Sequence, residues 1–379
     1  MLGGLGRLLA AFGTSGIDVY EWAQTDVQKV RLPNGPNWGN LAHPRPKLQF
    51  NGWKLAHAVT KADYLVERDL LLPGLGFLLQ IDHIIDFSAG ANLRLVPGSA
   101  ATLNDFTRTS LSGRVGQGLS LLFAQSKGYH FVCHLASDVN VVSHMSSLTK
   151  KLKAADFLFE DNRGARMILE SKASFSQPTN DPTLIKSILK AALTSQVDYW
   201  MTRLTPPASK GFALYSCLRE TGNAIPSALI FVDPPEQPTH QPVDIPQDQV
   251  RRRNYAAWLT AMGLTETARA LLQPSRDGRR AIELPLFQIG PRQFAVAVQS
   301  YSHDGERWLG MGLDVSVLNA ISAALGGEDG PLLAYERLFT DGLDMAMAEI
   351  ESGSIFPDGS YFGELNIDAQ LTGFQSFLL

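Results

Sequence analysis

Two short apolar runs lie close together in this chain and are joined by a loop with the length and composition of a hairpin. The first run covers residues 155–159 and the second covers residues 166–173, and the loop between them reads Asp-Asn-Arg-Gly-Ala. Short loops that contain glycine join antiparallel strands. Both runs are apolar enough for a sheet that other elements cover. The sequence therefore predicts a β-hairpin inside a larger fold, and this hairpin limits how the surrounding chain can be arranged.

The predicted hairpin brings charged side chains to one face. With Arg163 at its centre, Asp156 lies opposite Glu170. Directly opposed residues have Cβ atoms about 4.5 to 5.5 Å apart, so the two carboxylates are close enough to hold one divalent cation. Lys172 points to the same face because strand side chains alternate with a period of two. A one-residue slip would put the carboxylates on opposite faces, so the register decides whether a site exists.

The hairpin lies within an ordered series of elements. Helices are predicted over 112–126, which Gly128 ends, and over 182–204, which Asp181 caps. Strands are predicted over 129–135, 155–159, 166–173, 211–218 and 227–232. The predicted order is helix, three strands, helix and two strands. The fold class is therefore α/β, with a central mixed sheet flanked by helices.

The acidic-x-Lys triplet at 170–172, the upstream Asp156 and this order of elements resemble the PD-(D/E)xK nuclease superfamily, which has the restriction-endonuclease-like fold. The resemblance covers about residues 112–235. It implies that Asp156 and Glu170 hold Mg²⁺, or Mn²⁺ in its place, together with the main-chain carbonyl of Ser171. It also implies that Lys172 orients or activates the attacking water and offsets charge on the phosphate.

Some positions depart from that family's pattern. Ala155 replaces the proline that gives the motif its first letter, and the predicted helix over 112–126 contains no acidic residue. Gln117 is the nearest substitute for a helix carboxylate, because an amide oxygen can ligate a hard cation. Gln196 and Tyr199 resemble a Gln and Tyr pair on the later helix of RecB-type nucleases, although they are three residues apart rather than four. The resemblance implies that both contact phosphate or substrate.

Positive charge gathers around the expected site. Residues 145–215 contain ten Lys or Arg and six Asp or Glu, although the whole chain has a net charge of −4. Lys150 and Lys153, just before Asp156, are placed to follow a phosphate backbone. The alternative interpretation is a solvated hairpin face whose salt bridge contributes under about 1 kcal/mol. The apolar residues of both strands count against it, because burying charge is costly.

Three regions of different composition suggest three domains. With 379 residues, 45% of them hydrophobic, the chain can bury more than one core. Residues 1–110 are rich in Gly, Pro, Asn and Trp and predict a mixed, β-containing domain of unassigned role. Residues 111–235 form the nuclease-like domain, and a proline-rich stretch at 234–249 follows. Residues 250–379 are predicted to be mainly α-helical, with helices over 254–272, 314–324 and 331–350 and a candidate hairpin over 282–298.

Several classes of protein are excluded by what the sequence lacks. It has no run of about 18 uncharged apolar residues, so cytoplasmic residence and no membrane partner are expected. Cys133 and Cys217 lack zinc-type spacing and are expected to be reduced core thiols. His130 and His134 share a strand face, but no third ligand lies at a suitable spacing. The absence of a Gly-Lys-Ser/Thr loop and of a Gly-x-Ser-x-Gly elbow argues against a P-loop protein or an α/β-hydrolase.

The expected function is Mg²⁺-dependent hydrolysis of phosphodiester bonds. DNA as the substrate, and defence against phage or other foreign DNA as the setting, follow from the resemblance alone. The flanking regions are expected to supply target recognition, homo-oligomerisation or docking to a protein partner such as a helicase. Two alternatives stay open: a non-catalytic scaffold of the same fold that binds nucleic acid or a protein, and an enzyme that acts on RNA or a nucleotide.

Overall fold

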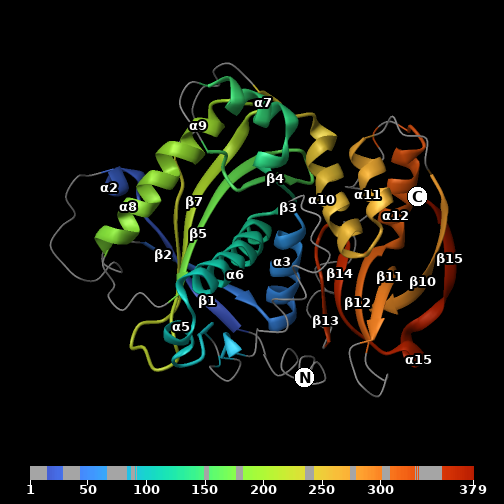
Figure 1. Ribbon diagram of the computed structural model, residues 1–379, viewed down its shortest axis with the longest axis horizontal. Coiled ribbons are helices and arrows are strands. Elements are labelled where there is room, and N and C mark those ends of the chain that lie inside the picture. The colour runs from blue at the N-terminus through green and yellow to red at the C-terminus, as the bar shows by residue number, and fades with distance from the viewer. Residues whose placement is uncertain are drawn as a thin grey trace.

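A computed structural model of the chain describes residues 15–28, 43–65, 83–86, 90, 92–148, 153–175, 182–234, 243–273, 279–300, 308–328, 330, 332 and 352–379. Its largest element is a seven-stranded sheet in the order β2-β1-β8-β7-β5-β4-β3 (Figure 1). The strands are β1 (Ser15–Glu21), β2 (His43–Phe50), β3 (Tyr129–His134), β4 (Phe157–Asp161), β5 (Arg166–Phe175), β7 (Ala208–Leu218) and β8 (Ala228–Val232). β5 and β7 are parallel, as are β1 and β8, and the other neighbours are antiparallel. The predicted mixed sheet is confirmed.

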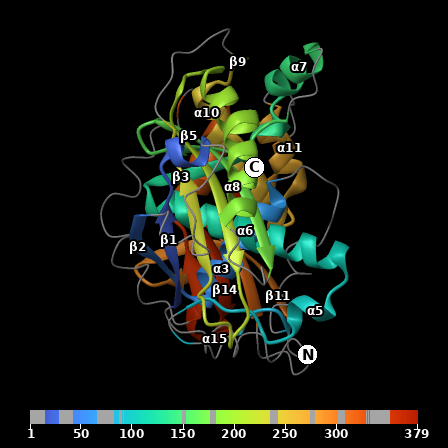
Figure 2. The ribbon, with the colours of Figure 1, turned by 90° about the vertical axis from the view of Figure 1, so that its left-hand side faces the viewer.

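Helices cover both faces of this sheet, as predicted. α6 (Asp105–Ser126) contacts β5 on one face, with α3 (Gly52–Tyr64) against it. On the other face α8 (Pro182–Ala192), the π-helical turn η5 (Leu193–Val197) and α9 (Asp198–Met201) follow one another. In Figure 1, α8 and α9 lie to the left of the sheet and α6 and α3 to its right, and Figure 2 shows α8 running along the strands and α6 across them. The other elements of this part are α2 (Gln24–Gln28), α5 (Ser99–Thr102), η4 (Leu135–Ser137), α7 (Val139–Ser147), β6 (Leu204–Thr205) and β9 (Val243–Asp244).

Glycines allow α6 to lie close to its neighbours. A Cβ atom on Gly116 would lie 2.4 Å from the Cβ atom of Ala173 on β5. A Cβ atom on Gly118 would lie 2.5 Å from Val59 on α3. These distances are shorter than van der Waals contact, so any larger residue would push α6 away from the sheet or from α3. The side chains on the Ala173 face of β5 therefore lie beneath α6.

The opposite face of the sheet is packed just as closely. A Cβ atom on Gly211 of β7 would lie 2.3 Å from the sulfur of Met201 on α9 and 2.6 Å from Val197 on η5. Gly211 pairs with Ile168 of β5, and paired strand residues point to the same face. The face of β5 that carries Ile168, and with it Glu170, is therefore the face covered by η5 and α9.

Strands from the start of the chain belong to the same sheet. β1 pairs with β8, matching Val19 to Leu229, and β2 forms the edge of the sheet beyond β1. Within the described residues, the region predicted as a separate β-containing domain has no sheet of its own.

α6 starts earlier than predicted, because the Asn104 side chain accepts a hydrogen bond from the N–H of Thr107 at 2.8 Å and caps the helix.

The C-terminal region was predicted to be mainly helical, and this prediction is wrong. It contains a separate six-stranded antiparallel sheet in the order β13-β14-β12-β11-β10-β15. The strands are β10 (Ala281–Ile289), β11 (Arg292–Ser300), β12 (Trp308–Asp314), β13 (Gly353–Ile355), β14 (Ser360–Leu365) and β15 (Leu371–Leu378). The candidate hairpin over 282–298 is confirmed as β10 and β11. β12 was missed because glycines interrupt its pattern: a Cβ atom on Gly310 would lie 2.6 Å from both Leu365 and Val296.

Helices of this region are present beside the second sheet. The predicted helix over 254–272 is divided into α10 (Gln247–Ala261) and α11 (Thr265–Leu272), with Gly263 between them at a φ of 81°. The helix predicted over 314–324 is α12 (Val315–Leu325), and α15 (Ile367–Gln370) is short. The helix predicted over 331–350 lies outside the described residues except at residue 332.

Two further expectations concern the thiols and the membrane. Cys133 and Cys217 are buried free cysteines, as predicted. Burial raises the pKa of the Cys133 thiol to about 12, so it is not a thiolate nucleophile near neutral pH. Among the helices that the structure describes, none is both long enough and apolar enough to span a membrane.

Candidate metal centre

The hairpin forms with the predicted register. β4 and β5 are antiparallel, and the pair of residues at the end of their ladder is Phe157 with Leu169. Continued one position outward, this register matches Asp156 with Glu170 and puts both side chains on the same face. Hydrogen bonds link Asp156 to Glu170 and Ser171 at this point. Lys172 follows two residues later on that face. The hairpin thus brings together the three side chains that the sequence singled out.

Beyond the last pair of the β4–β5 ladder, the carboxylates of Asp156 and Glu170 accept hydrogen bonds from main-chain N–H groups. Oε2 of Glu170 accepts a hydrogen bond from the N–H of Asp156 at 3.0 Å. Oδ2 of Asp156 accepts one from the N–H of Ser171 at 2.9 Å. In a continued ladder, carbonyl groups of the neighbouring strand would accept from such N–H groups. The strands therefore separate at Asp156, and carboxylate oxygens line the gap.

Ser171 presents its carbonyl group to the same gap. The N–H and C=O groups of one residue in an extended strand point to the same side. Because the N–H of Ser171 points to Asp156, its carbonyl oxygen faces that side too. The Ser171 hydroxyl lies on the other face, where it accepts a hydrogen bond from the Ser120 hydroxyl on α6 at 2.9 Å. The main chain of Ser171, rather than its side chain, is the group that can reach a cation beside the carboxylates.

The two carboxylates are crowded and removed from water. Burial, followed by the Asp156 charge, raises the pKa of Glu170 to about 7, although Lys172 acts in the opposite direction. Burial also raises the pKa of Asp156, against the opposing charges of Lys172 and His134. The Glu170 side chain is fully buried, whereas that of Lys172 is 38% exposed. The site therefore has too little positive charge of its own and opens on the Lys172 side.

The oxygen atoms of this site fit a hard divalent cation. Mg²⁺ and Mn²⁺ prefer carboxylate, carbonyl and water oxygens, and Mg²⁺ usually keeps several waters beside one or two carboxylates. Asp156, Glu170 and the Ser171 carbonyl provide such a set. Within the part of the chain that the structure describes, no group of three or more His, Cys, Asp or Glu side chains is arranged to hold a metal. Among the described residues, the Ser171 carbonyl is the main-chain oxygen that lies beside the two carboxylates.

The structure does not bring Gln117 to this site. Gln117 lies on α6, which covers the face of β5 that carries the Ser171 side chain. Glu170 points to the opposite face, under η5 and α9. Gln117 therefore lies across the sheet from the carboxylates and does not stand in for a helix carboxylate.

Gln196 and Tyr199 lie on the helical segment that covers the site, but their polar atoms contact protein groups. Nε2 of Gln196 donates a hydrogen bond to the carbonyl oxygen of Ala154 at 2.9 Å. The Tyr199 hydroxyl lies 2.8 Å from Nε2 of His144 on α7. Gln196 thus holds the segment that leads to Asp156, while Tyr199 connects α9 to α7.

Of the two lysines expected to follow a phosphate backbone, Lys150 and Lys153, only Lys153 is among the described residues. Lys153 is exposed and lies three residues before Asp156. Its carbonyl oxygen accepts a hydrogen bond from Nε1 of Trp200 at 3.1 Å. Lys150 lies outside the described residues.

Sequence reasoning missed Trp200 and gave His134 no role. Trp200 is four residues after Gln196, and residues four apart share a helix face. This spacing could have indicated that Gln196 and Trp200, rather than Gln196 and Tyr199, act together. His134 ends β3 and its charge lowers the pKa of Asp156, but pairing between β3 and β4 was needed to place it there.

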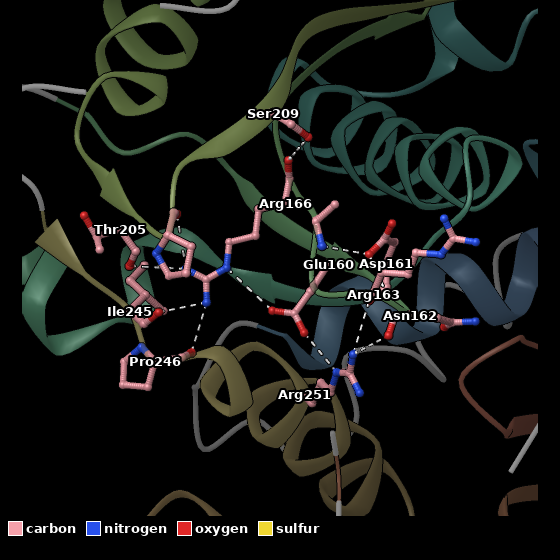
Figure 3. A network of polar contacts seen from close by, with 12 residues as sticks. Glu160, Asp161, Asn162, Arg163, Arg166, Thr205, Ser209, Ile245, Pro246 and Arg251 are labelled. Atoms are coloured by element: carbon pink, nitrogen blue, oxygen red, sulfur yellow. Dashed lines mark hydrogen bonds and ion pairs between the residues drawn. The ribbon is translucent and has the colours of Figure 1, made fainter. Parts of the chain in front are cut away.

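A buried charge network holds the other end of the hairpin (Figure 3). The fully buried Glu160 carboxylate lies 2.9 Å from Nε of Arg251 and 3.5 Å from Nε of Arg166. Arg251, on α10, also donates to the carbonyl oxygens of Asp161 and Asn162 in the hairpin turn, at 3.3 and 3.0 Å. This carboxylate has two protein cations, so its charge is balanced without a ligand. The network ties the hairpin to the C-terminal region.

Comparison with protein-family models, with curated proteins and with solved structures finds no match for this chain.

Proposed function

We propose that the chain is a divalent-metal-dependent nuclease that hydrolyses phosphodiester bonds. The observation that carries the proposal is the pair of Asp156 and Glu170, which are opposed where the hairpin strands separate and lie beside the Ser171 carbonyl. Charged groups kept only for stability are normally balanced by opposite charge when they are buried. Here two carboxylates face one partly exposed lysine, with His134 as a further charge beside Asp156, and burial still raises the pKa of Glu170 to about 7. A cation from solution would supply the missing charge.

Each residue of the site has a place in this reaction. Asp156, Glu170 and the Ser171 carbonyl would hold the ion, which when bound polarises a phosphoryl oxygen and lowers the pKa of a coordinated water. Lys172 forms an ion pair with Oε1 of Glu170. Once a cation engages Glu170, the ammonium group of Lys172 is free to donate to a phosphate oxygen or to orient the attacking water. Substrate would approach from the Lys172 side, since the Glu170 carboxylate is fully buried.

DNA is the proposed substrate, and defence against foreign DNA the proposed setting, on the resemblance of the triplet and hairpin to PD-(D/E)xK nucleases. A helicase-type partner, homo-oligomerisation and a cytoplasmic location belong to the same proposal. Because these assignments rest on the resemblance, RNA is tested beside DNA in the experiment below.

One observation favours a second candidate, a non-catalytic scaffold of similar fold. The helix on which related nucleases carry a further carboxylate has one acidic residue in the structure, Asp105, but it lies in the exposed first turn and pairs with Arg108. Gln117 lies on the other face of the sheet. In that case the Glu170 and Lys172 pair would be structural. The two candidates differ in one measurable property, because only the nuclease needs to bind a divalent cation.

The test is a cleavage assay on plasmid DNA and on RNA with Mg²⁺, with Mn²⁺ and with EDTA. Wild type is expected to cut only with metal, and both Asp156→Asn and Lys172→Met are expected to lose cutting. Lys210→Met is the matched control, because Lys210 is 47% exposed and pairs with Asp233 elsewhere on the sheet. Cutting that is unchanged in Asp156→Asn and Lys172→Met would remove the site assignment. Absence of cutting and of metal binding in wild type would favour the scaffold.

A further inference from the structure

Residues 153–156 lead into the site and end at Asp156. Most of the hydrogen bonds to their main-chain groups come from residues outside the strands of the sheet. The N–H of Asp156 is bound by the Glu170 carboxylate, and its carbonyl oxygen accepts from the N–H of Leu135 at 3.1 Å. Two residues earlier, the Ala154 carbonyl accepts from the Gln196 side chain, and the Lys153 carbonyl accepts from the Trp200 side chain. Consecutive carbonyl groups are thus held by two side chains of one helical segment.

That helical segment has an unusual shape at this point. α8, η5 and α9 are continuous in sequence from Pro182 to Met201, and the middle part, Leu193–Val197, is π-helical. Single π-helical turns inside α-helices are rare and occur often at functional sites. Gln196 lies in the π-helical turn and is 8% exposed, and Trp200 is fully buried. Because both side chains are fixed by packing, they can hold the Lys153 and Ala154 carbonyls in one place.

We propose that Gln196 and Trp200 are positioning residues that set the location of the Asp156 carboxylate by holding the carbonyl groups of Ala154 and Lys153. The proposal rests on the proposed metal site and assigns Gln196 a different task from the substrate contact predicted from sequence. Neither side chain touches the ion or the substrate. Groups that orient metal ligands in this way typically change metal affinity or activity by about 10- to 100-fold when they are lost.

The test measures the affinity of the full-length, metal-free protein for Mn²⁺ by isothermal titration calorimetry, with no nucleic acid present. Gln196→Met keeps the side-chain length and removes the donor, and is expected to weaken Mn²⁺ binding by at least about tenfold. Trp200→Phe keeps an aromatic ring and removes the indole N–H. It is expected to weaken binding less, because Lys153 is one residue further from Asp156. Thr194→Val is the matched control: it removes a hydrogen bond of the same π-helical turn, to the Lys190 carbonyl at 2.8 Å, that does not lead to the site.

Cleavage kinetics provide a second readout that a general loss of packing would not give. In Gln196→Met the Mn²⁺ concentration for half-maximal rate should rise, saturating Mn²⁺ should restore most of the rate, and KM for DNA should stay the same. A raised KM with unchanged Mn²⁺ affinity would identify Gln196 as a substrate contact and overturn the proposal. Wild-type affinity in both Gln196→Met and Trp200→Phe would overturn it as well.

Failure of the proposed function gives a different result. If wild type binds Mn²⁺ but cuts no nucleic acid, the nuclease proposal fails, while the titration still decides whether Gln196 and Trp200 position the site. If wild type binds no Mn²⁺, the metal site and the positioning proposal fall together. Thermal unfolding of each variant, compared with Thr194→Val, shows whether a weaker affinity reflects an unfolded fraction.

Discussion

Two buried carboxylates in this chain, those of Asp358 and Glu170, have pKa values shifted in opposite directions. Asp358 forms an ion pair with Lys61 and accepts hydrogen bonds from Asn254 at 2.7 Å and from the Ser360 hydroxyl at 2.6 Å. Burial alone would raise its pKa, but Lys61 and these hydrogen bonds lower it to about 2. Glu170 is equally buried, yet burial and its carboxylate neighbour raise its pKa to about 7.

This difference separates a balanced buried charge from an unbalanced one. The Asp358 cluster joins α3 and α10 to the loop between β13 and β14, and its partners balance the charge inside the protein. The Asp156 and Glu170 pair leaves charge unbalanced at a place that opens to solvent beside Lys172. Burial by itself therefore does not distinguish the two, whereas the sum of the charges around each carboxylate does.

The largest expected effect is on stability, at the balanced cluster. Asp358→Asn leaves Lys61 buried without its counter-charge, which should lower the free energy of unfolding by about 3 to 5 kcal/mol. Urea unfolding at pH 7 measures the change. Adding Lys61→Met to the same protein should recover part of the loss, because the uncompensated ammonium group is then gone. A loss below about 1 kcal/mol in the single variant would show that the pair is not a structural charge pair.

At the metal centre the same substitution should act on activity instead. Asp156→Asn keeps an oxygen that can accept from the Ser171 N–H but removes the charge that would hold the proposed cation. Metal-dependent cleavage should fall by at least about a hundredfold. The free energy of unfolding of the metal-free protein should stay the same or rise, since a like-charge contact is relieved. Single-turnover kinetics measure the cleavage rate, and urea unfolding in EDTA measures the free energy of unfolding. If Asp156→Asn is strongly destabilised, as Asp358→Asn is expected to be, the two carboxylates do not differ in the way described.

The two clusters should also respond to pH in opposite directions. The folded-state pKa of Glu170, about 7, lies above its unfolded value of about 4.3, so its contribution to stability is present below about pH 4.3 and lost as pH rises through 7. The folded-state pKa of Asp358, about 2, lies below its unfolded value of about 3.9, so its contribution is present above about pH 3.9 and lost as pH falls through 2.

Urea unfolding in EDTA between pH 5 and pH 8 measures the Glu170 part of this difference. Wild type should lose on the order of 2 to 3 kcal/mol relative to Glu170→Gln over that range, and saturating Mg²⁺ should abolish the loss. If the difference between wild type and Glu170→Gln is the same at pH 5 and pH 8, Glu170 is not held at a raised pKa.

The smallest effect is expected at Gln117. Because α6 lies on the other face of β5, Gln117→Ala should change Mn²⁺ affinity and cleavage rate by less than about twofold. A loss comparable with that of Asp156→Asn would mean that α6 supplies a ligand after all. Such a result would require the Gln117 side chain to reach the face of β5 that carries Glu170 in the metal-bound protein.

The parts of the site that could be predicted from sequence are the local ones. The length of the loop at 161–165 and the alternation of strand residues determine which residues face each other, so Asp156, Glu170 and Lys172 were placed together correctly. Strand alternation says nothing about which helix covers which face, and this is why Gln117 was placed beside the carboxylates. The four-residue spacing of Gln196 and Trp200 puts them on one helix face, but the main-chain carbonyl groups that they hold, at Ala154 and Lys153, depend on tertiary packing that the sequence does not show.

The fold shows the same limit on a larger scale. The hairpin of β10 and β11 is local in sequence and was predicted, whereas the rest of its sheet was not. β10 also pairs with β15, matching Ala281 to Leu378, and such distant pairing leaves no mark on either strand alone. In β12 the close contacts at Gly310 and Gly312 require glycines, which weaken the strand pattern.

The most direct test of the metal centre is a crystal structure of the wild-type protein grown with Mn²⁺, with the ion located by its anomalous scattering. We expect one strong peak about 2.0 to 2.6 Å from a carboxylate oxygen of both Asp156 and Glu170 and from the carbonyl oxygen of Ser171, with Lys172 released from Glu170. A peak elsewhere, or no peak beside the two carboxylates at millimolar Mn²⁺, would contradict it.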